Sequence, residues 1–267
     1  EHGLGVTQGF DDVWNGSAWQ TGSIPLPAGS FLATLTGLSC SSPSFCMAVG
    51  NYATGDFSVV WNGTSWKLAP LIGGQNDRWW AVSCSASTWC LAVGSSYVST
   101  AFVPIADKWT GSAWANAKAP LPPGGAAGEL DGVSCVSSLF CMAVGSYHTA
   151  NAAEDAAWAS ELSSGVWTAT ATTPSSSPSS TLGSVSCVSA SSCVAAGDGS
   201  PALAVGPAVG EVPTVDAWNG SAWTGSTVSP MASGAWLYGV SCSGASCVSV
   251  GSQATANADL GFSIAGG

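Results

Sequence analysis

The sequence predicts an all-β protein built from five repeats, and three observations support this fold class. A pair of closely spaced cysteines recurs five times along the 267 residues, and a short apolar run that ends in glycine follows each pair. A pair of tryptophans around a tight turn alternates with the cysteine pairs. The chain starts with a tryptophan hairpin and finishes with a cysteine hairpin, so its two end segments are complementary halves of one repeat. Together these patterns predict antiparallel strands arranged in a ring.

Each cysteine pair begins with a Ser-Cys dipeptide, with five residues between the cysteines in the first four repeats and four in the last. The apolar run that follows, as in Met47 to Gly50, fits a strand that is buried on both faces. No Cys-x-x-Cys motif occurs, and only His2 and His148 could join a metal site, so disulfides are expected and a metal is not. The predicted disulfides are Cys40 with Cys46, Cys84 with Cys90, Cys135 with Cys141, Cys187 with Cys193, and Cys242 with Cys247.

The tryptophan pairs surround an Asn-Gly turn, or in one repeat a Thr-Gly turn, which is a strong hairpin signal because the turn positions favour positive φ. A further copy has a longer turn between Trp158 and Trp167. Since the tryptophans recur at one repeat position, we expect them to pack between neighbouring units rather than to bind a ligand. The regular copies span residues 14–19, 61–66, 109–114 and 218–223.

Two hairpins per repeat give four antiparallel strands, and the mean repeat of about 53 residues is close to the length of a propeller blade. We therefore predict one domain over residues 1–267, a five-bladed β-propeller with one disulfide in each blade. The N- and C-terminal half-blades are expected to close the ring, and residues 252–267 are expected to form an extra strand or a tail. The predicted blades are 31–70, 78–118, 129–170, 181–227, and a fifth that joins 236–251 with 10–22.

Composition restricts the partners and the compartment. The formal charge is −11, with four Lys and Arg against fifteen Asp and Glu, which argues against nucleic acid and anionic membrane surfaces as partners. No apolar run approaches the roughly 18 residues of a membrane span, so membrane insertion is not expected. Ten paired cysteines predict an oxidising compartment, and we expect a secreted protein whose signal peptide has been removed. No phosphate-binding glycine loop occurs, so no cofactor is expected, and the oligomeric state is not predicted.

The positions at which the repeats differ are the best candidates for a functional site, because the requirements of the fold are common to all blades. The most variable column lies three residues before the motif serine, and a second lies two residues earlier. Strand alternation would place both columns on one face near the ring axis. The first column reads Thr36, Trp80, Asp131, Gly183 and Tyr238, and the second reads Thr34, Arg78, Glu129, Thr181 and Trp236.

The loops that follow the apolar strands should reach the same rim of the ring, and they carry Tyr52, Tyr97, Tyr147, His148 and Asp198. Aromatic rings with a few carboxylates and one arginine suit neutral polyhydroxylated ligands, whose CH faces stack on the rings. The sequence therefore predicts a carbohydrate or polysaccharide ligand, bound through Trp80, Arg78, Tyr238, Trp236 and the loop residues. The alternative is that these aromatic side chains fill the axial hole.

Two further functions stay open. A glycoside hydrolase would need two carboxylates beside the scissile bond. A surface or scaffold protein without a small ligand would need neither. A serine nucleophile is disfavoured, because no Gly-x-Ser-x-Gly motif occurs. The best catalytic candidates are Asp131 and Glu129, with Asp77, Asp198, Glu154, Asp11 or Asp12 as possible partners.

The Ser-Cys-x5-Cys-x-Ala-Val-Gly and Trp-Asn-Gly-x-x-Trp pattern resembles repeats of exported proteins from actinobacteria and related soil bacteria, and the match spans nearly the whole chain. The architecture also resembles that of tachylectin-type lectins and of the five-bladed arabinanase and fructosidase glycosidases. The lectin resemblance implies one sugar site per blade, whereas the rim positions here differ between blades and favour a single central site. The glycosidase resemblance implies three acids on successive inner strands, but the column here offers only Asp131.

Overall fold

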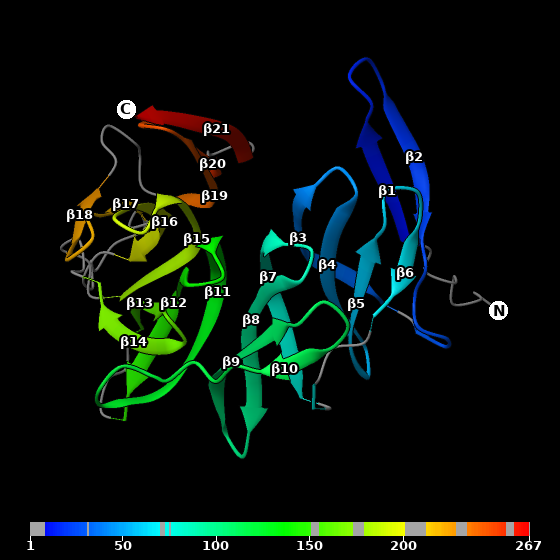
Figure 1. Ribbon diagram of the computed structural model, residues 1–267. Coiled ribbons are helices and arrows are strands. Elements are labelled where there is room, and N and C mark those ends of the chain that lie inside the picture. The colour runs from blue at the N-terminus through cyan, green and yellow to red at the C-terminus, as the bar shows by residue number, and fades with distance from the viewer. Residues whose placement is uncertain are drawn as a thin grey trace.

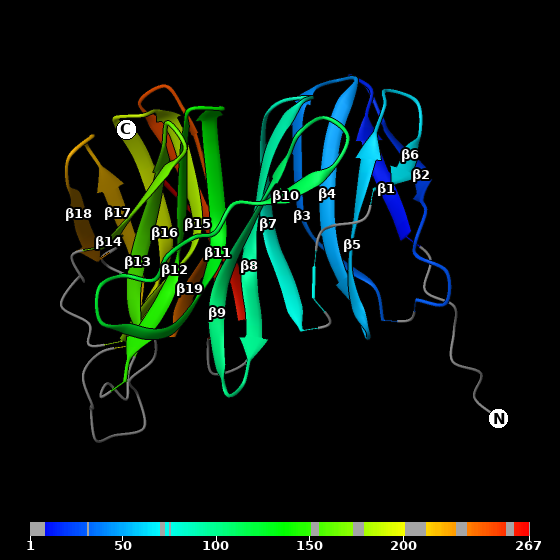
Figure 2. The ribbon, with the colours of Figure 1, turned by 60° about the horizontal axis from the view of Figure 1, so that its bottom comes forward.

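The computed structural model describes residues 9–30, 32–69, 73–74, 76–150, 155–172, 179–200, 212–227, 234–254 and 259–266. Every helix or strand assigned within these ranges is a β-strand, and each strand pairs antiparallel with its neighbour in the chain. The sheets follow one another around a curve, with their first strands innermost (Figures 1 and 2). The predicted all-β fold with four-stranded blades is confirmed.

Four blades have four strands each, the fifth has three, and a separate hairpin precedes them. The hairpin consists of β1 (Gly9–Trp14) and β2 (Trp19–Ile24). Blade 1 comprises β3 (Thr34–Ser42), β4 (Phe45–Tyr52), β5 (Gly55–Trp61) and β6 (Trp66–Leu68), and blade 2 comprises β7 (Asp77–Ala86), β8 (Trp89–Val98), β9 (Ala101–Trp109) and β10 (Trp114–Asn116). Blade 3 comprises β11 (Gly125–Ser137), β12 (Phe140–Thr149), β13 (Ala156–Ser163) and β14 (Val166–Ala171), and blade 4 comprises β15 (Ser179–Ser189), β16 (Ser192–Ser200), β17 (Val212–Trp218) and β18 (Trp223–Thr227). Blade 5 comprises β19 (Ala235–Ser243), β20 (Ser246–Ala254) and β21 (Asp259–Gly266).

All five predicted disulfides are formed, each between facing residues of the first two strands of a blade. The bonded cysteines have Cα atoms only 3.9 to 4.1 Å apart. Closing so small a loop stabilises the folded state by about 2 kcal/mol per bond in the chain-entropy treatment. The disulfides therefore fix the register of each hairpin and add modestly to stability.

The core lies between blades, as the apolar runs predict. Met47 and Val49 of β4 are completely buried against Trp79 and Val82 of β7 in the next blade. The same arrangement recurs between the second strand of blade 3 and the first strand of blade 4. The second strands of blades 1 to 3 are covered on both faces, which explains why their sequences are continuously apolar.

The serine of each Ser-Cys motif joins neighbouring blades. The hydroxyl of Ser39 accepts a hydrogen bond of 2.9 Å from the backbone N–H of Cys84 in the next blade. Three further bonds of 2.9 to 3.0 Å repeat this contact, from Cys135 to Ser83, from Cys187 to Ser134 and from Cys242 to Ser186. A hydroxyl is therefore needed immediately before the first cysteine, and the dipeptide is conserved among the repeats for this reason.

Each innermost strand also contains a β-bulge that the sequence analysis did not foresee. In β7 the register passes from Trp79 to Ala81, which leaves Trp80 without a partner on β8. The bulge recurs in the innermost strand of every blade, always opposite the glycine that ends the apolar run. The extra residues are Thr36, Trp80, Asp131, Gly183 and Tyr238, which is the variable column of the sequence.

The pairing predicted for the fifth blade differs in the structure. Strand β1 pairs with β2, whereas the second strand of blade 5, β20, pairs with β21. Residues 259–266 therefore form the extra strand and occupy the position expected for residues 10–14. The β1–β2 hairpin and β21 lie at opposite ends of the arc of blades (Figure 1). The expectation that 10–22 and 236–251 share one sheet is thus not met in this arrangement, because the edge of β20 is already occupied.

Candidate functional site

Two of the predicted site residues on blade 3, Glu129 and Asp131, meet Trp80 on blade 2, and these three residues are called the rim group below. Ser95, on β8, is completely buried and lies between them. The indole N–H of Trp80 donates to the hydroxyl of Ser95 at 3.3 Å, and that hydroxyl donates to the carboxylate of Glu129 at 3.3 Å. Asp131 lies two residues further along β11 and is close enough for electrostatic interaction with Glu129. The bulges place both Trp80 and Asp131, since each is the unpaired residue of its strand.

The environment raises the pKa of both carboxyl groups. Burial, together with the neighbouring charge of Glu129, raises the pKa of Asp131 to about 8. Burial also raises the pKa of Glu129, and the charge of Asp155 adds to this effect. The hydrogen bonds from Ser95 and Trp80 act in the opposite direction and favour the ionised form of Glu129. Asp131 is therefore mainly protonated at neutral pH, while Glu129 is the acceptor of the pair.

A second polar group joins blades 1 and 2. The indole N–H of Trp79 donates to the Asp56 carboxylate at 2.6 Å, and the Asn51 amide makes two 2.9 Å hydrogen bonds to the Trp79 backbone. Burial raises the pKa of Asp56, the bond from Trp79 lowers it, and the charges of Asp77 and Arg78 have small opposing effects. This group fixes β7 against blade 1, which positions the adjacent Trp80.

The predicted loop aromatics lie in separate blades, each against a ring of the facing strand. The ring of Tyr52 is 6.3 Å from that of Phe57, and the ring of Tyr97 is 5.1 Å from that of Phe102. Tyr147 lies edge-on to the ring of Trp158 at 6.4 Å. These contacts stiffen the hairpin ends, and none of them connects a tyrosine to Trp80.

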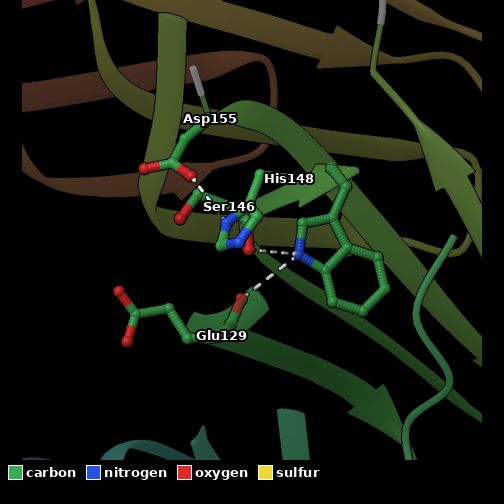
Figure 3. Close-up of polar contacts among 5 residues, drawn as sticks. Glu129, Ser146, His148 and Asp155 are labelled. Atoms are coloured by element: carbon green, nitrogen blue, oxygen red, sulfur yellow. Dashed lines mark hydrogen bonds and ion pairs between the residues drawn. The ribbon is translucent and has the colours of Figure 1, made fainter. Parts of the chain in front are cut away.

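His148 and Asp155 form an exposed ion pair with 3.2 Å between Nδ1 and Oδ1. Figure 3 shows the Glu129 side chain extending away from this pair, while the Glu129 backbone carbonyl accepts a 3.2 Å hydrogen bond from the Trp158 indole. On blade 4, the hydroxyl of Thr181 donates to Asp198 at 3.2 Å. His148 and Asp198 therefore have local partners of their own at the rim.

The remaining predicted residues lie in other parts of the arc, away from blades 2 and 3. Tyr238 is 65% exposed, and its hydroxyl lies 2.9 Å from that of Ser252 within blade 5. Trp236 is half-buried on the same strand, two residues before Tyr238. Asp11 and Asp12 lie on β1, apart from the rim group, and Glu154 falls outside the described residues. The structure therefore brings together Trp80, Glu129 and Asp131 from the predicted set.

Known proteins resemble this arrangement in fold. No family model matches the sequence, and no curated protein matches it either. Among solved structures, YCF48 bound to a D1 peptide aligns with a TM-score of 0.53 and 14% identity, over 92% of this chain and 68% of that one. The tricorn protease aligns with a TM-score of 0.51 and 8% identity, over 89% of this chain and 24% of that one. The chain folds as a β-propeller.

A third propeller structure, from the GH130 family of mannoside phosphorylases and glycoside hydrolases, aligns with a TM-score of 0.49 and 9% identity, over 92% of this chain and 91% of that one. At such identities the two similarities with TM-scores above 0.5 establish the fold alone. Any function must be argued from the side chains of this propeller.

Sequence reasoning missed two buried acids in the third strands of blades 2 and 4. Asp107 is 1% exposed, and burial, with the charges of Asp77 and Asp56, raises its pKa to about 7. Asp216 is 3% exposed, and burial raises its pKa to about 6. Both stand two residues before the first tryptophan of a hairpin, as does Asp12, and this shared repeat position was the available signal. Because both acids are buried, they affect the stability of the fold and are not part of the rim site.

A cleft of about 850 Å³ lies away from this rim group, between β1 and blade 1. Its walls include Phe10 and Trp14 on one side and Leu38 and Trp66 on the other.

The part of the chain that the structure describes contains no helix of the length and apolarity that a bilayer span requires. Within the same ranges, no cluster of three or more His, Cys, Asp or Glu is placed to hold a metal ion.

Proposed function

We propose that this propeller is an extracellular carbohydrate-binding protein whose site lies on the rim of blades 2 and 3. The proposal rests chiefly on one observation, the hydrogen-bonded series from Trp80 through Ser95 to Glu129, with Asp131 beside it. Five disulfides are consistent with an oxidising environment, and secretion is part of the proposal.

The chemistry of these groups matches sugar hydroxyls and CH faces. A half-buried indole held at its N–H edge is a rigid apolar surface for a pyranose ring. The carboxyl oxygens of Glu129 accept hydrogen bonds, and a protonated Asp131 both donates and accepts them, which suits ligands rich in hydroxyl groups. Arg78, two residues before Trp80 on β7, adds a further donor. An aromatic surface beside a few directed hydrogen-bonding groups suits polyhydroxylated ligands.

Trp80→Ala is expected to weaken glycan binding at least about tenfold, equivalent to about 1.4 kcal/mol, because the stacking surface is lost. A glycan array with the wild-type protein selects the ligand, and isothermal titration then compares the variants. The matched control is Trp19→Ala, which removes an exposed tryptophan from the β1–β2 hairpin. Equal affinities of the wild type and Trp80→Ala would contradict this site. Absence of any glycan ligand for the wild type would instead favour a surface or scaffold role.

A second candidate function is polysaccharide hydrolysis, favoured by the different environments of the two rim carboxyls. Asp131, with its pKa raised to about 8, is protonated at neutral pH as a general acid must be. Glu129, which accepts hydrogen bonds from Ser95 and Trp80, would serve as the base or nucleophile.

If the protein is a hydrolase, Asp131→Asn is expected to lower kcat at least about a hundredfold, because the amide cannot donate a proton to the leaving group. The wild-type rate should fall as the pH rises above about 8, as Asp131 loses its proton. A screen of polysaccharides for released reducing ends measures both effects, and Glu161→Gln, which changes a partly exposed acid on β13 of the same blade, serves as the control. Full activity of Asp131→Asn would remove this assignment.

A further inference from the structure

We propose that β20 has two alternative partners, β21 and the β1–β2 hairpin, and that pairing with the hairpin closes the five blades into a ring. The hairpin has the Trp-Asn-Gly-Ser-Ala-Trp sequence that forms the outer half of a blade, but it has no inner strands of its own. Blade 5 has the inner Ser-Cys hairpin but lacks a tryptophan hairpin. Each segment therefore supplies what the other lacks.

The β1–β2 hairpin lies beside blade 1, where Asp11 and Trp66 line the same cleft and each has a buried polar atom without a partner. In blade 2, the second tryptophan of the hairpin, Trp114, donates its indole N–H to Ser58 of the preceding blade at 3.1 Å. Ser58 stands three residues before the first tryptophan of its own hairpin, Trp61. The equivalent atoms here are the indole nitrogen of Trp66 and Oδ1 of Asp11, three residues before Trp14. Both are buried without a hydrogen-bond partner in the described structure. A hydrogen bond from the Trp66 indole to Asp11 would satisfy both atoms.

One of the five serine–cysteine hydrogen bonds that a closed ring would contain is missing. Four motif serines accept a hydrogen bond from the next motif cysteine, which links blades 1 to 5 in sequence. A closed ring adds a fifth bond, from the N–H of Cys40 in blade 1 to the hydroxyl of Ser241 in blade 5. Within the described residues that bond is not formed, although both groups are present in their motifs.

Apolar side chains that are buried between other blades are exposed at the two ends of the arc. Val248 and Val250 of β20 are 45% and 49% exposed, whereas their equivalents Met47 and Val49 are completely buried. On blade 1, Leu38 is 63% exposed, whereas its equivalents Val82, Val133 and Val185 in the next three blades are 6 to 9% exposed. The exposed face of β20 in blade 5 and the exposed face of blade 1 are therefore the two faces that would cover each other in a closed ring. We take each of them as the partner of the other.

The repeat predicts the register of the alternative pairing. In blade 1, the first tryptophan of the hairpin faces the second cysteine, Trp61 opposite Cys46. The same rule places Trp14 opposite Cys247 and Val13 opposite Val248. In the described arrangement, β21 holds these positions, with Gly266 opposite Cys247 and Ala265 opposite Val248. Closure would also bring Tyr238 and Trp236 beside blade 1 and complete the circle of bulge residues.

Engineered cysteine pairs distinguish the two arrangements. Val13→Cys with Val248→Cys tests the ring, and Ala265→Cys with Val248→Cys tests the pairing of β20 with β21. Both variants are folded in a glutathione redox buffer, and their monomers are separated from any covalent dimers. Peptide mapping by mass spectrometry then identifies the sixth disulfide. We expect an intrachain bond between positions 13 and 248. Failure of that bond while positions 248 and 265 link fully would overturn the proposal, as would a 13–248 bond found only in covalent dimers.

Hydrogen exchange on the unmodified protein gives a second test that needs no new disulfide. The amide of Cys40 is expected to be protected to within about tenfold of the amide of Cys84, and Ser241→Ala should remove most of that protection. Ser39→Ala is the positive control, because Ser39 accepts the existing bond from Cys84. Rapid exchange at Cys40 in the wild type, or protection that Ser241→Ala leaves unchanged, would overturn ring closure.

Discussion

The free energy of unfolding of this propeller is expected to be highest near pH 4 and to fall as the pH rises towards 8. Asp107 and Asp216 are almost completely buried, and their folded-state pKa values of about 7 and about 6 exceed the ordinary value of 3.8. A carboxyl group with a raised pKa stabilises the folded state fully below its unfolded pKa. That stability is lost as the pH rises through the folded pKa. The increasing negative charge of an already acidic protein acts in the same direction.

The expected decrease in the free energy of unfolding is large for a single side chain. Each unit of pKa difference corresponds to about 1.4 kcal/mol, so Asp107 alone contributes a change on the order of 3 kcal/mol between pH 4 and pH 8. Urea denaturation followed by tryptophan fluorescence at pH 4, 6 and 8 measures it. An unfolding free energy that rises with pH over this range would show that these carboxyls are ionised and stabilised in the fold.

Substitution of Asp107 separates its effect from that of total charge. Asp107→Asn mimics the protonated side chain, so it should match the wild type at pH 4 and be more stable by about 3 kcal/mol at pH 8. The matched control is Asp155→Asn, which removes the same charge from an exposed position. Equal effects of the two substitutions at pH 8 would attribute the pH dependence to net charge instead of burial.

The sequence was sufficient to predict the repeat, the disulfides and the variable column, because each depends on residues that recur at fixed spacing. The Ser-Cys dipeptide recurs because the serine bonds the next blade and the cysteine closes the hairpin. The variable column was identified by comparison between repeats. Its physical origin is the bulge, which leaves Trp80 and Asp131 outside the register of their sheets. A bulge has no requirement for a particular side chain, so the residues there are free to vary with function.

Other features depend on contacts that a sequence pattern does not specify. Ser95 looks like any strand serine, and only packing between blades 2 and 3 places it between Trp80 and Glu129. The partner of β20 was predicted as β1 because the hairpin motif is strong, whereas residues 259–266 contain no such motif. Backbone pairing requires no specific side chain, so a strand of weak sequence pattern can occupy an edge that a better match would also fit.

Gly145→Ala is expected to destabilise the protein by at least about 3 kcal/mol, because the glycine opposite each bulge has no room for a side chain. A Cβ at this position would overlap the backbone carbonyl oxygen of Glu129 and lie 2.9 Å from the Cα of Leu130. Backbone atoms cannot move aside as a flexible side chain can, so the bulge that holds Asp131 would have to open.

The matched control is a glycine within a bulge rather than opposite one. Gly183 is the extra residue of the blade 4 bulge, and a Cβ there would meet no atom within 4 Å. Gly183→Ala should therefore change the unfolding free energy by less than about 1 kcal/mol, in either direction. Urea denaturation compares the two variants, and the ligand affinity of any folded Gly145→Ala protein reports on Asp131. If Gly145→Ala were as stable as Gly183→Ala, the close approach of the two strands at the bulge would be wrong, and with it the placement of the rim carboxyls.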